Sequence, residues 1–135
     1  MSQSEGVPPT KSITVLVCGG RAYLRRDRVF RALDDLAEKS AENPLGETIV
    51  TVVHGDCPTG ADRWADEWAL VNWAPCKRYP AAWDVHGRSA GPIRNQQMLN
   101  DSKPDLVLAF PGGPGTADMV RRAKMAGVEV REFIR

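Results

Sequence analysis

The sequence has no excess of charge of either sign. Its 135 residues include 18 Lys and Arg against 17 Asp and Glu, a formal net charge of +1. A protein that binds nucleic acid mainly through electrostatics carries a strong basic excess. The balanced charge therefore argues against nucleic acid as a partner.

Cysteine patterns, targeting segments and long apolar runs are also missing. Cys18, Cys57 and Cys76 form no CxxC motif and cannot all pair, which excludes a disulfide framework, and the two histidines lack a clustered carboxylate pair. We therefore expect no metal. The N-terminus lacks the pattern of a signal peptide, and no apolar run approaches the ~18 residues of a membrane span. We expect a cytoplasmic protein that makes no contact with a membrane.

Three well-known catalytic or cofactor motifs are incomplete. The segment 55–60 has the glycine spacing of a P-loop, but Ala61 and Asp62 follow where Lys and Ser or Thr are required. The segment 113–115 begins a GxGxxG fingerprint that ends on Asp118, and no GxSxG nucleophile elbow exists. These gaps argue against ATP hydrolysis, nicotinamide chemistry and a Ser-His-Asp hydrolase, and we expect no cofactor.

Short apolar runs alternate with segments of helical periodicity along most of the chain. This alternation is typical of βαβ units and a parallel sheet. We expect residues 1–11 to be a disordered polar tail and residues 12–135 to form a single domain. The predicted fold is α/β, with three layers and a mostly parallel five-stranded sheet, and we expect the strand order 3-2-1-4-5. The strands are expected at 13–18, 48–54, 76–79, 105–110 and 128–133, and helices at about 29–37, 61–69, 92–101 and 117–126.

Glycine clusters follow the first, second and fourth predicted strands, each directly before a helix. In an open parallel sheet, ligands bind beyond the carboxyl ends of the strands, where backbone N–H groups at a helix N-terminus can approach an anion. A tight turn explains any one of these loops equally well, but three at one sheet edge favour a binding crevice. The residues concerned are Gly19 and Gly20, Gly55 and Gly60, and Gly112, Gly113 and Gly115.

The predicted strand order places Arg21 beside Thr116 at the mouth of this crevice. A phosphate there would receive backbone N–H groups of residues 113–117, the Thr116 hydroxyl and a guanidinium from Arg21, Arg88 or Arg94. Surface ion pairs of Arg21 with Asp27, or of Arg94 with Asp101, are the alternative.

Other polar residues near the crevice have two interpretations each. Asp62 could hold a ribose hydroxyl or simply be an acid favoured by the helix dipole, and Asn95 could contact a base or sugar or face solvent. His54 is either a ligand contact or a hydrogen-bonded structural histidine.

Aromatic residues also leave alternatives open. Trp83 lies near the start of the aperiodic segment 80–90, which we interpret as a lid, and its ring could stack on a base. Trp64 and Trp68 share the apolar face of the second helix, which favours core or dimer packing over base stacking.

Four blocks of the sequence carry a resemblance to a known family. They are VCGGRAY (17–23), HGDCPTGADRWADEWA (54–69), WDVHGRSAGPIRNQQML (83–99) and PGGPGTADMV (111–120). Together they resemble the YspA/YpsA-related branch of the SLOG superfamily. The resemblance implies a Rossmann-like fold and a small nucleotide or nucleotide-derived ligand. The superfamily also includes the LOG phosphoribohydrolases, which are homodimers that release a base from nucleoside monophosphates, and the DNA-processing protein DprA.

The LOG motifs are only partly present. Their phosphate-cradling PGGxGT loop is matched by Pro111, Gly112, Gly113, Gly115 and Thr116, and Arg94 resembles the arginine that faces the ligand. Their GGGxxG loop is matched at Gly55 and Gly60, whereas Asp56 and Cys57 depart from it. By the same comparison, Asp56 belongs to the ligand-binding loop.

The glutamate needed for glycosidic cleavage in LOG enzymes falls on Met119, which can neither move a proton nor stabilise a cationic centre. The leading hypothesis is therefore nucleotide-ligand binding. The alternative is an N-glycosidase that uses Asp118 or Asp62 as its acid. Single-stranded DNA binding, as in DprA, is disfavoured by the balanced charge, and a homodimer is suggested by the LOG proteins and the apolar second helix.

Overall fold

The computed structural model describes residues 11–135, so the predicted tail, apart from Lys11, lies outside the described residues. Five strands alternate with helices in the order expected from the sequence. Their bounds are β1 (Lys11–Cys18), α1 (Arg26–Leu36), β2 (Thr48–His54), α2 (Ala61–Val71), β3 (Cys76–Arg78), α3 (Trp83–His86), the 3-10 turn η1 (Gly87–Ser89), α4 (Ala90–Ser102), β4 (Leu106–Ala109), α5 (Pro114–Met125) and β5 (Glu129–Glu132).

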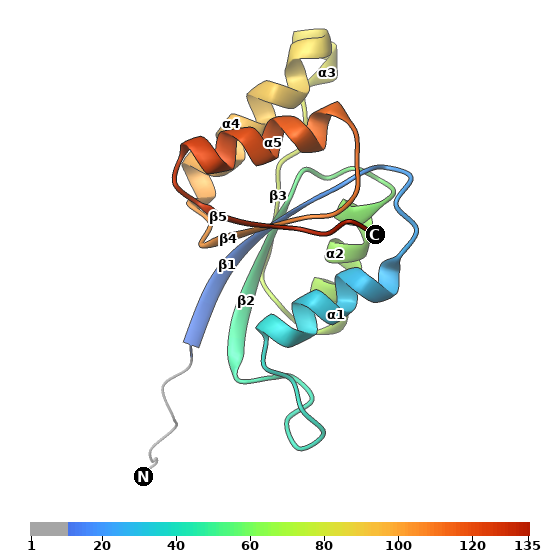
Figure 1. Ribbon diagram of the computed structural model, residues 1–135, viewed down its shortest axis with the longest axis vertical. Coiled ribbons are helices and arrows are strands. Elements are labelled where there is room, and N and C mark those ends of the chain that lie inside the picture. The colour runs from blue at the N-terminus through green and yellow to red at the C-terminus, as the bar shows by residue number, and fades with distance from the viewer. Residues whose placement is uncertain (1–10) are drawn as a thin grey trace.

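The strands form one sheet of order β3-β2-β1-β4-β5, and every neighbouring pair is parallel. Helices α1 and α2 cover one face of this sheet, and α4 and α5 cover the other (Figure 1). The predicted Rossmann-like fold and strand order are therefore confirmed. Because the chain leaves β1 toward β2 on one side and β4 lies on its other side, the carboxyl end of β1 is the switch point where such sheets bind ligands.

Side chains of β1 alternate between two cores, one on each face of the sheet. Val15 and Val17 pack with Trp68 and the rest of the α1–α2 layer, and Leu16 packs with Met98 and the α4–α5 layer. A strand buried on both faces is a continuous apolar run, which is why β1, β2 and β4 were recognisable in the sequence.

The apolar face of α2 belongs to the core of this chain. Trp68 is buried and donates its indole N–H to Asp34, and Trp64 donates to the carbonyl of Tyr23 over 2.8 Å. Core packing is therefore the correct interpretation of these two tryptophans. The face that suggested self-association is already covered by the chain itself.

The segment 80–90 differs from its predicted irregular lid. It contains α3 and η1, and α4 begins at Ala90, two residues before the predicted start. None of the α3 residues is buried, so this short helix has no apolar stripe that could reveal it in the sequence. No helix within residues 11–135 is both long and apolar enough to span a membrane.

Candidate ligand-binding site

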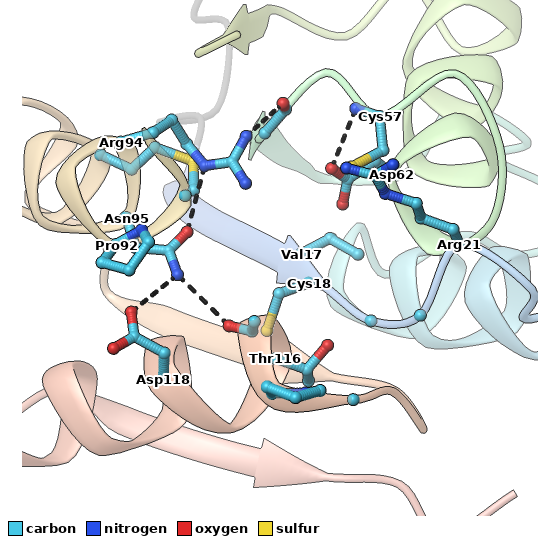
Figure 2. Close-up of a pocket in the computed structure, with 18 of the residues that line it drawn as sticks. Val17, Cys18, Arg21, Cys57, Asp62, Pro92, Arg94, Asn95, Thr116 and Asp118 are labelled. Carbon is cyan, nitrogen blue, oxygen red and sulfur yellow. Dashed lines mark hydrogen bonds between the residues drawn. The ribbon is translucent and has the colours of Figure 1, made fainter. Parts of the chain in front are cut away.

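A cavity of about 620 Å³ lies at the carboxyl end of β1, between the loop that precedes α2 on one side and α4 and α5 on the other (Figure 2). Residues predicted to bind ligand form much of its wall. Those that line it are Gly19, Gly20, Arg21, Gly55, Asp62, Arg88, Arg94, Asn95, Gly113, Gly115, Thr116 and Asp118. Four predicted residues, Asp56, Gly60, Pro111 and Gly112, lie outside that lining.

Glycines outside the lining hold the three loops together. The N–H of Gly20 donates to the carbonyl of Pro111 over 2.9 Å, and a Cβ on Gly112 would lie 2.6 Å from that same nitrogen. Gly60 has a φ of +76° and packs against the backbone of Gly20 and Arg21. Backbones can approach this closely only where side chains are absent, so Gly60 and Gly112 shape the cavity without lining it.

Gly113 and Gly115 have a different environment. Apart from chain neighbours and the backbone of α5 itself, a Cβ on either would meet no atom of residues 11–135 within 4 Å, so packing does not require glycine at these two positions. Gly113 is the N-cap of α5 and offers no side-chain cap, and Pro114 has no N–H. The N–H groups of Gly115 and Thr116 therefore lack the intrahelical partners that later residues have. This end of α5 provides free donors, a positive dipole end and open space for an anion.

Three exposed arginines from three different elements surround the mouth of the cavity. Arg21 follows β1, Arg88 lies in η1 and Arg121 lies on α5. The Arg21 guanidinium lies over the Trp83 ring, 5.8 Å from its centroid. The Asp27 carboxylate forms its ion pair with Arg25 and not with Arg21. The surface ion pair considered for Arg21 is therefore wrong.

Arg94 is largely a structural strut. Its Nη1 donates to the carbonyls of Gly55 and Tyr79, and its Nε donates to Asn95 Oδ1 over 3.1 Å. A Cβ on Gly55 would lie 2.6 Å from the Arg94 guanidinium carbon, so a side chain there would displace the guanidinium. These contacts replace the surface pair with Asp101 considered from the sequence, and only Nη2 is left to reach a ligand.

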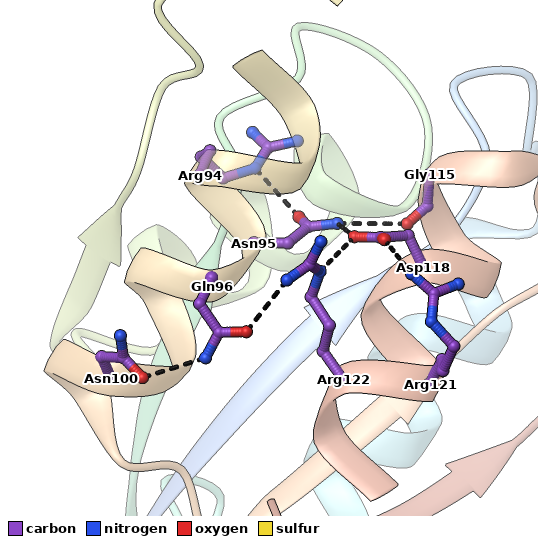
Figure 3. Close-up of polar contacts among 8 residues, drawn as sticks. All are labelled: Arg94, Asn95, Gln96, Asn100, Gly115, Asp118, Arg121 and Arg122. Atoms are coloured by element: carbon purple, nitrogen blue, oxygen red, sulfur yellow. Dashed lines mark hydrogen bonds and ion pairs between the residues drawn. The ribbon is translucent and has the colours of Figure 1, made fainter. Parts of the chain in front are cut away.

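Asn95 connects α4 to the first turn of α5 (Figure 3). Its Nδ2 donates to Asp118 Oδ2 over 3.0 Å and to the Gly115 carbonyl over 3.2 Å. The residue is only 5% exposed, so the solvent-facing alternative is wrong. Asp118 also accepts from Arg121 over 2.6 Å and from Arg122 over 2.8 Å, and this network fixes the first turn of α5 against α4.

Comparisons with known proteins identify the family of this chain. Residues 13–86 match the family described as the YspA, cpYpsA-related SLOG family. The chain belongs to this family. A protein described as Gene 61 protein of Mycobacterium phage D29 is 38% identical over 127 residues, which cover 88% of this chain and 94% of that protein.

This member of the SLOG family differs from the LOG enzymes at the position of their glutamate. Met119 lies on the face of α5 that packs against the sheet and is 1% exposed. One residue earlier on the helix, Asp118 reaches the cavity wall, as expected from the ~100° rotation per residue. Burial raises the Asp118 pKa, but hydrogen bonds from Arg122, Asn95 and Arg121 outweigh burial, so the pKa lies below its usual range. Asp118 is therefore ionised at neutral pH and unsuited to donate a proton.

Asp62 has the opposite electrostatic environment. Its side chain lines the cavity and accepts from the Cys57 N–H over 3.2 Å. The residue is 6% exposed because it lies in the first turn of α2, under the loop 55–60. Burial raises its pKa, and the hydrogen bond from the Cys57 N–H and the nearby Arg94 guanidinium only partly oppose this.

His54, Asp66 and Cys76 form a cluster that the sequence analysis missed, because its members come from β2, α2 and β3. Their potential ligand atoms lie within 4.8 Å of one another. His54 Nδ1 accepts from the Asp56 N–H, so the neutral ring carries its proton on Nε2 and donates to Asp66 over 2.8 Å. Arg78 donates to the same oxygen, and burial raises the Cys76 pKa to about 12. The cluster is therefore a closed hydrogen-bonded brace, in agreement with a structural role for His54.

Two cavity residues of interest were not singled out from the sequence, Cys57 and Arg121. Cys57 follows β2 within a glycine loop, which is a usable signal for a lining residue. Arg121 lies seven residues after Pro114 on an ordinary charged helix face, so nothing local distinguishes it from Arg122.

Proposed function

We propose that this protein binds a nucleotide or nucleotide-derived ligand, with a phosphate group at the N-terminus of α5. The observation that carries the proposal is the pair Gly113 and Gly115, which leave open space beside unpartnered helix N–H groups. Helix N-termini of this kind bind phosphate through backbone donors and the helix dipole. Arg21 and the Thr116 hydroxyl line the same cavity and would complete the phosphate site.

The remainder of the cavity has the chemistry for a nucleoside. Trp83 lines it, is 47% exposed and offers a ring face for a base. Asp62 lines the same cavity, and its carboxyl group is suited to a sugar hydroxyl. Membership of the SLOG family supports a nucleotide-related function in general terms.

Isothermal titration calorimetry with nucleoside monophosphates and diphosphates of adenine, guanine and uracil tests this proposal. We expect at least one series to bind, with inorganic phosphate as a weak competitor. Arg21→Ala should weaken binding about tenfold, the loss of one charge-assisted contact of ~1.4 kcal/mol. Arg63→Ala is the matched control, because this exposed arginine pairs with Glu67 on the outer side of α2. Silence of every nucleotide with folded protein would overturn the proposal.

A second candidate is cleavage of the N-glycosidic bond of a bound nucleotide. The raised pKa of Asp62 favours it, because a buried carboxyl that retains its proton can act as a general acid. Chromatography of free base released from nucleoside monophosphates provides the assay. We expect Asp62→Asn to abolish release, and the absence of release over many hours from the unmodified protein would exclude this candidate.

A further inference from the structure

A second cavity adjoins the candidate site on the outer side of α4. Its volume is also about 620 Å³, and residues of η1, α4 and α5 line it. Arg88 and Pro92 line both cavities, so the two spaces meet at these residues. Binding pockets for whole small ligands have volumes of ~300–1,000 Å³, and the first cavity alone is large enough for a nucleoside monophosphate. The second is available for a further part of the same ligand.

The charge at the junction favours a second phosphate. The first cavity already has Arg21 and the free N–H groups of α5 for one phosphate. Arg88 is exposed at the junction, and within residues 11–135 no carboxylate lies within ion-pair distance of it. A free guanidinium between two cavities is suited to a phosphate that connects two parts of one molecule.

The lining of the second cavity is suited to hydroxyl groups. Gln97 and Asn100 offer exposed amides, and Asp101 and Ser89 contribute a carboxylate and a hydroxyl. The amides and the hydroxyl both donate and accept hydrogen bonds and the carboxylate accepts them, which together suits a polyol. No aromatic side chain is among the residues that line this cavity, so a second base would have no ring on which to stack.

We propose that this second cavity is a subsite for a sugar, which makes the ligand class nucleoside diphosphate sugars. In this arrangement the nucleoside occupies the first cavity, the diphosphate passes from the α5 N-terminus to Arg88, and the sugar contacts Gln97 and Asn100. The inference rests on the proposed function, because the nucleoside end anchors the ligand.

Calorimetry on three matched series tests the inference: AMP, ADP and ADP-ribose; GMP, GDP and GDP-mannose; UMP, UDP and UDP-glucose. We expect the diphosphate sugar of one series to bind at least tenfold more tightly than its diphosphate. The double variant Gln97→Ala/Asn100→Ala should remove that advantage and leave the affinity for the diphosphate unchanged. Both side chains are exposed, and a thermal melt verifies that the variant folds.

Asn43→Ala is the matched control, because Asn43 lies in the loop before β2, at the opposite edge of the sheet. Equal affinities for a diphosphate and its sugar, or a double variant that keeps the advantage, would overturn the sugar subsite alone. Failure of every compound in all three series would overturn the proposed function together with it.

Discussion

At the scale of single residues, two carboxylates line one cavity and have opposite pKa shifts. Both are buried, but Asp118 receives two guanidinium groups and an amide, whereas Asp62 receives a backbone N–H and has no contacting guanidinium. Burial without a counter-charge disfavours the ionised form. Asp118 therefore holds the first turn of α5 against α4, and Asp62 is the better candidate for the proposed ligand contact or acid chemistry.

The raised pKa of Asp62 has a consequence for stability. The unfolded chain loses this proton near the ordinary pKa of 3.8, and the folded protein loses it at a higher pH. The residue therefore makes the fold less stable as pH rises above 3.8. Asp62→Asn is therefore expected to raise the melting temperature at pH 7 and to have little effect at pH 3. Thermal melts at the two pH values test this, and a lower melting temperature at pH 7 would contradict it.

The pKa of Asp66 is shifted in the opposite direction. Burial opposes its ionisation, but hydrogen bonds from Arg78 and His54 prevail and lower its pKa to about 2. The resulting stability is present above pH 3.8 and is lost as pH falls toward 2. Asp66→Asn should lower the free energy of unfolding at pH 7 by about 1–2 kcal/mol after solvent screening. It should also flatten the loss of stability between pH 4 and 2.

Urea unfolding as a function of pH measures both effects of Asp66→Asn. Asp35→Asn, at an exposed position of α1, is the control and should reproduce the unmodified profile. An Asp66→Asn profile with the full acid dependence would show that the brace of His54, Asp66 and Arg78 contributes little.

At the scale of elements, the glycines of the three loops divide into those that shape the protein and those that leave room. Gly115→Ala adds a methyl group to the first turn of α5, where no protein atom is near. Alanine is favoured over glycine in helices, so the variant should be more stable by up to about 1 kcal/mol. It should bind nucleotide at least tenfold more weakly, because the methyl group would occupy the phosphate site.

Gly60→Ala is the informative counterpart. Its φ of +76° and its contact with the Gly20 and Arg21 backbone leave no room for a side chain, so this variant should be destabilised. Thermal melts and calorimetry on both variants separate the two roles. A Gly115→Ala protein that is destabilised, or that binds as the unmodified protein does, would remove the main support for the phosphate site.

What the sequence reveals about these elements depends on how local the signal is. β2 has its predicted bounds, and the parallel sheet and the three glycine loops follow from the alternation of apolar runs with helical segments and from the glycine positions. The burial of Asn95 and the strut formed by Arg94 depend on Gly115 and Gly55, which are distant in sequence. Such contacts leave no periodic pattern, and neither does the exposed helix α3.

At the scale of the whole molecule, the cavity joins the two halves of the sheet. Its walls come from the loops after β1 and β2 on one side and from α4 and α5 on the other. A ligand that contacts all of them stabilises the folded state by ~2.7 kcal/mol at a concentration of 100 Kd. That stabilisation should reach loops that are distant in sequence but adjacent in space.

Hydrogen exchange measured with and without saturating ligand tests this coupling. We expect slower exchange in residues 19–23, 55–60 and 113–117 together, because one bound ligand would contact all three loops. Residues 39–47 precede β2 at the opposite edge of the sheet and should change only as far as global unfolding contributes to their exchange. Protection confined to 113–117 would mean that the ligand occupies the α5 N-terminus alone, and the cavity would then not act as one site.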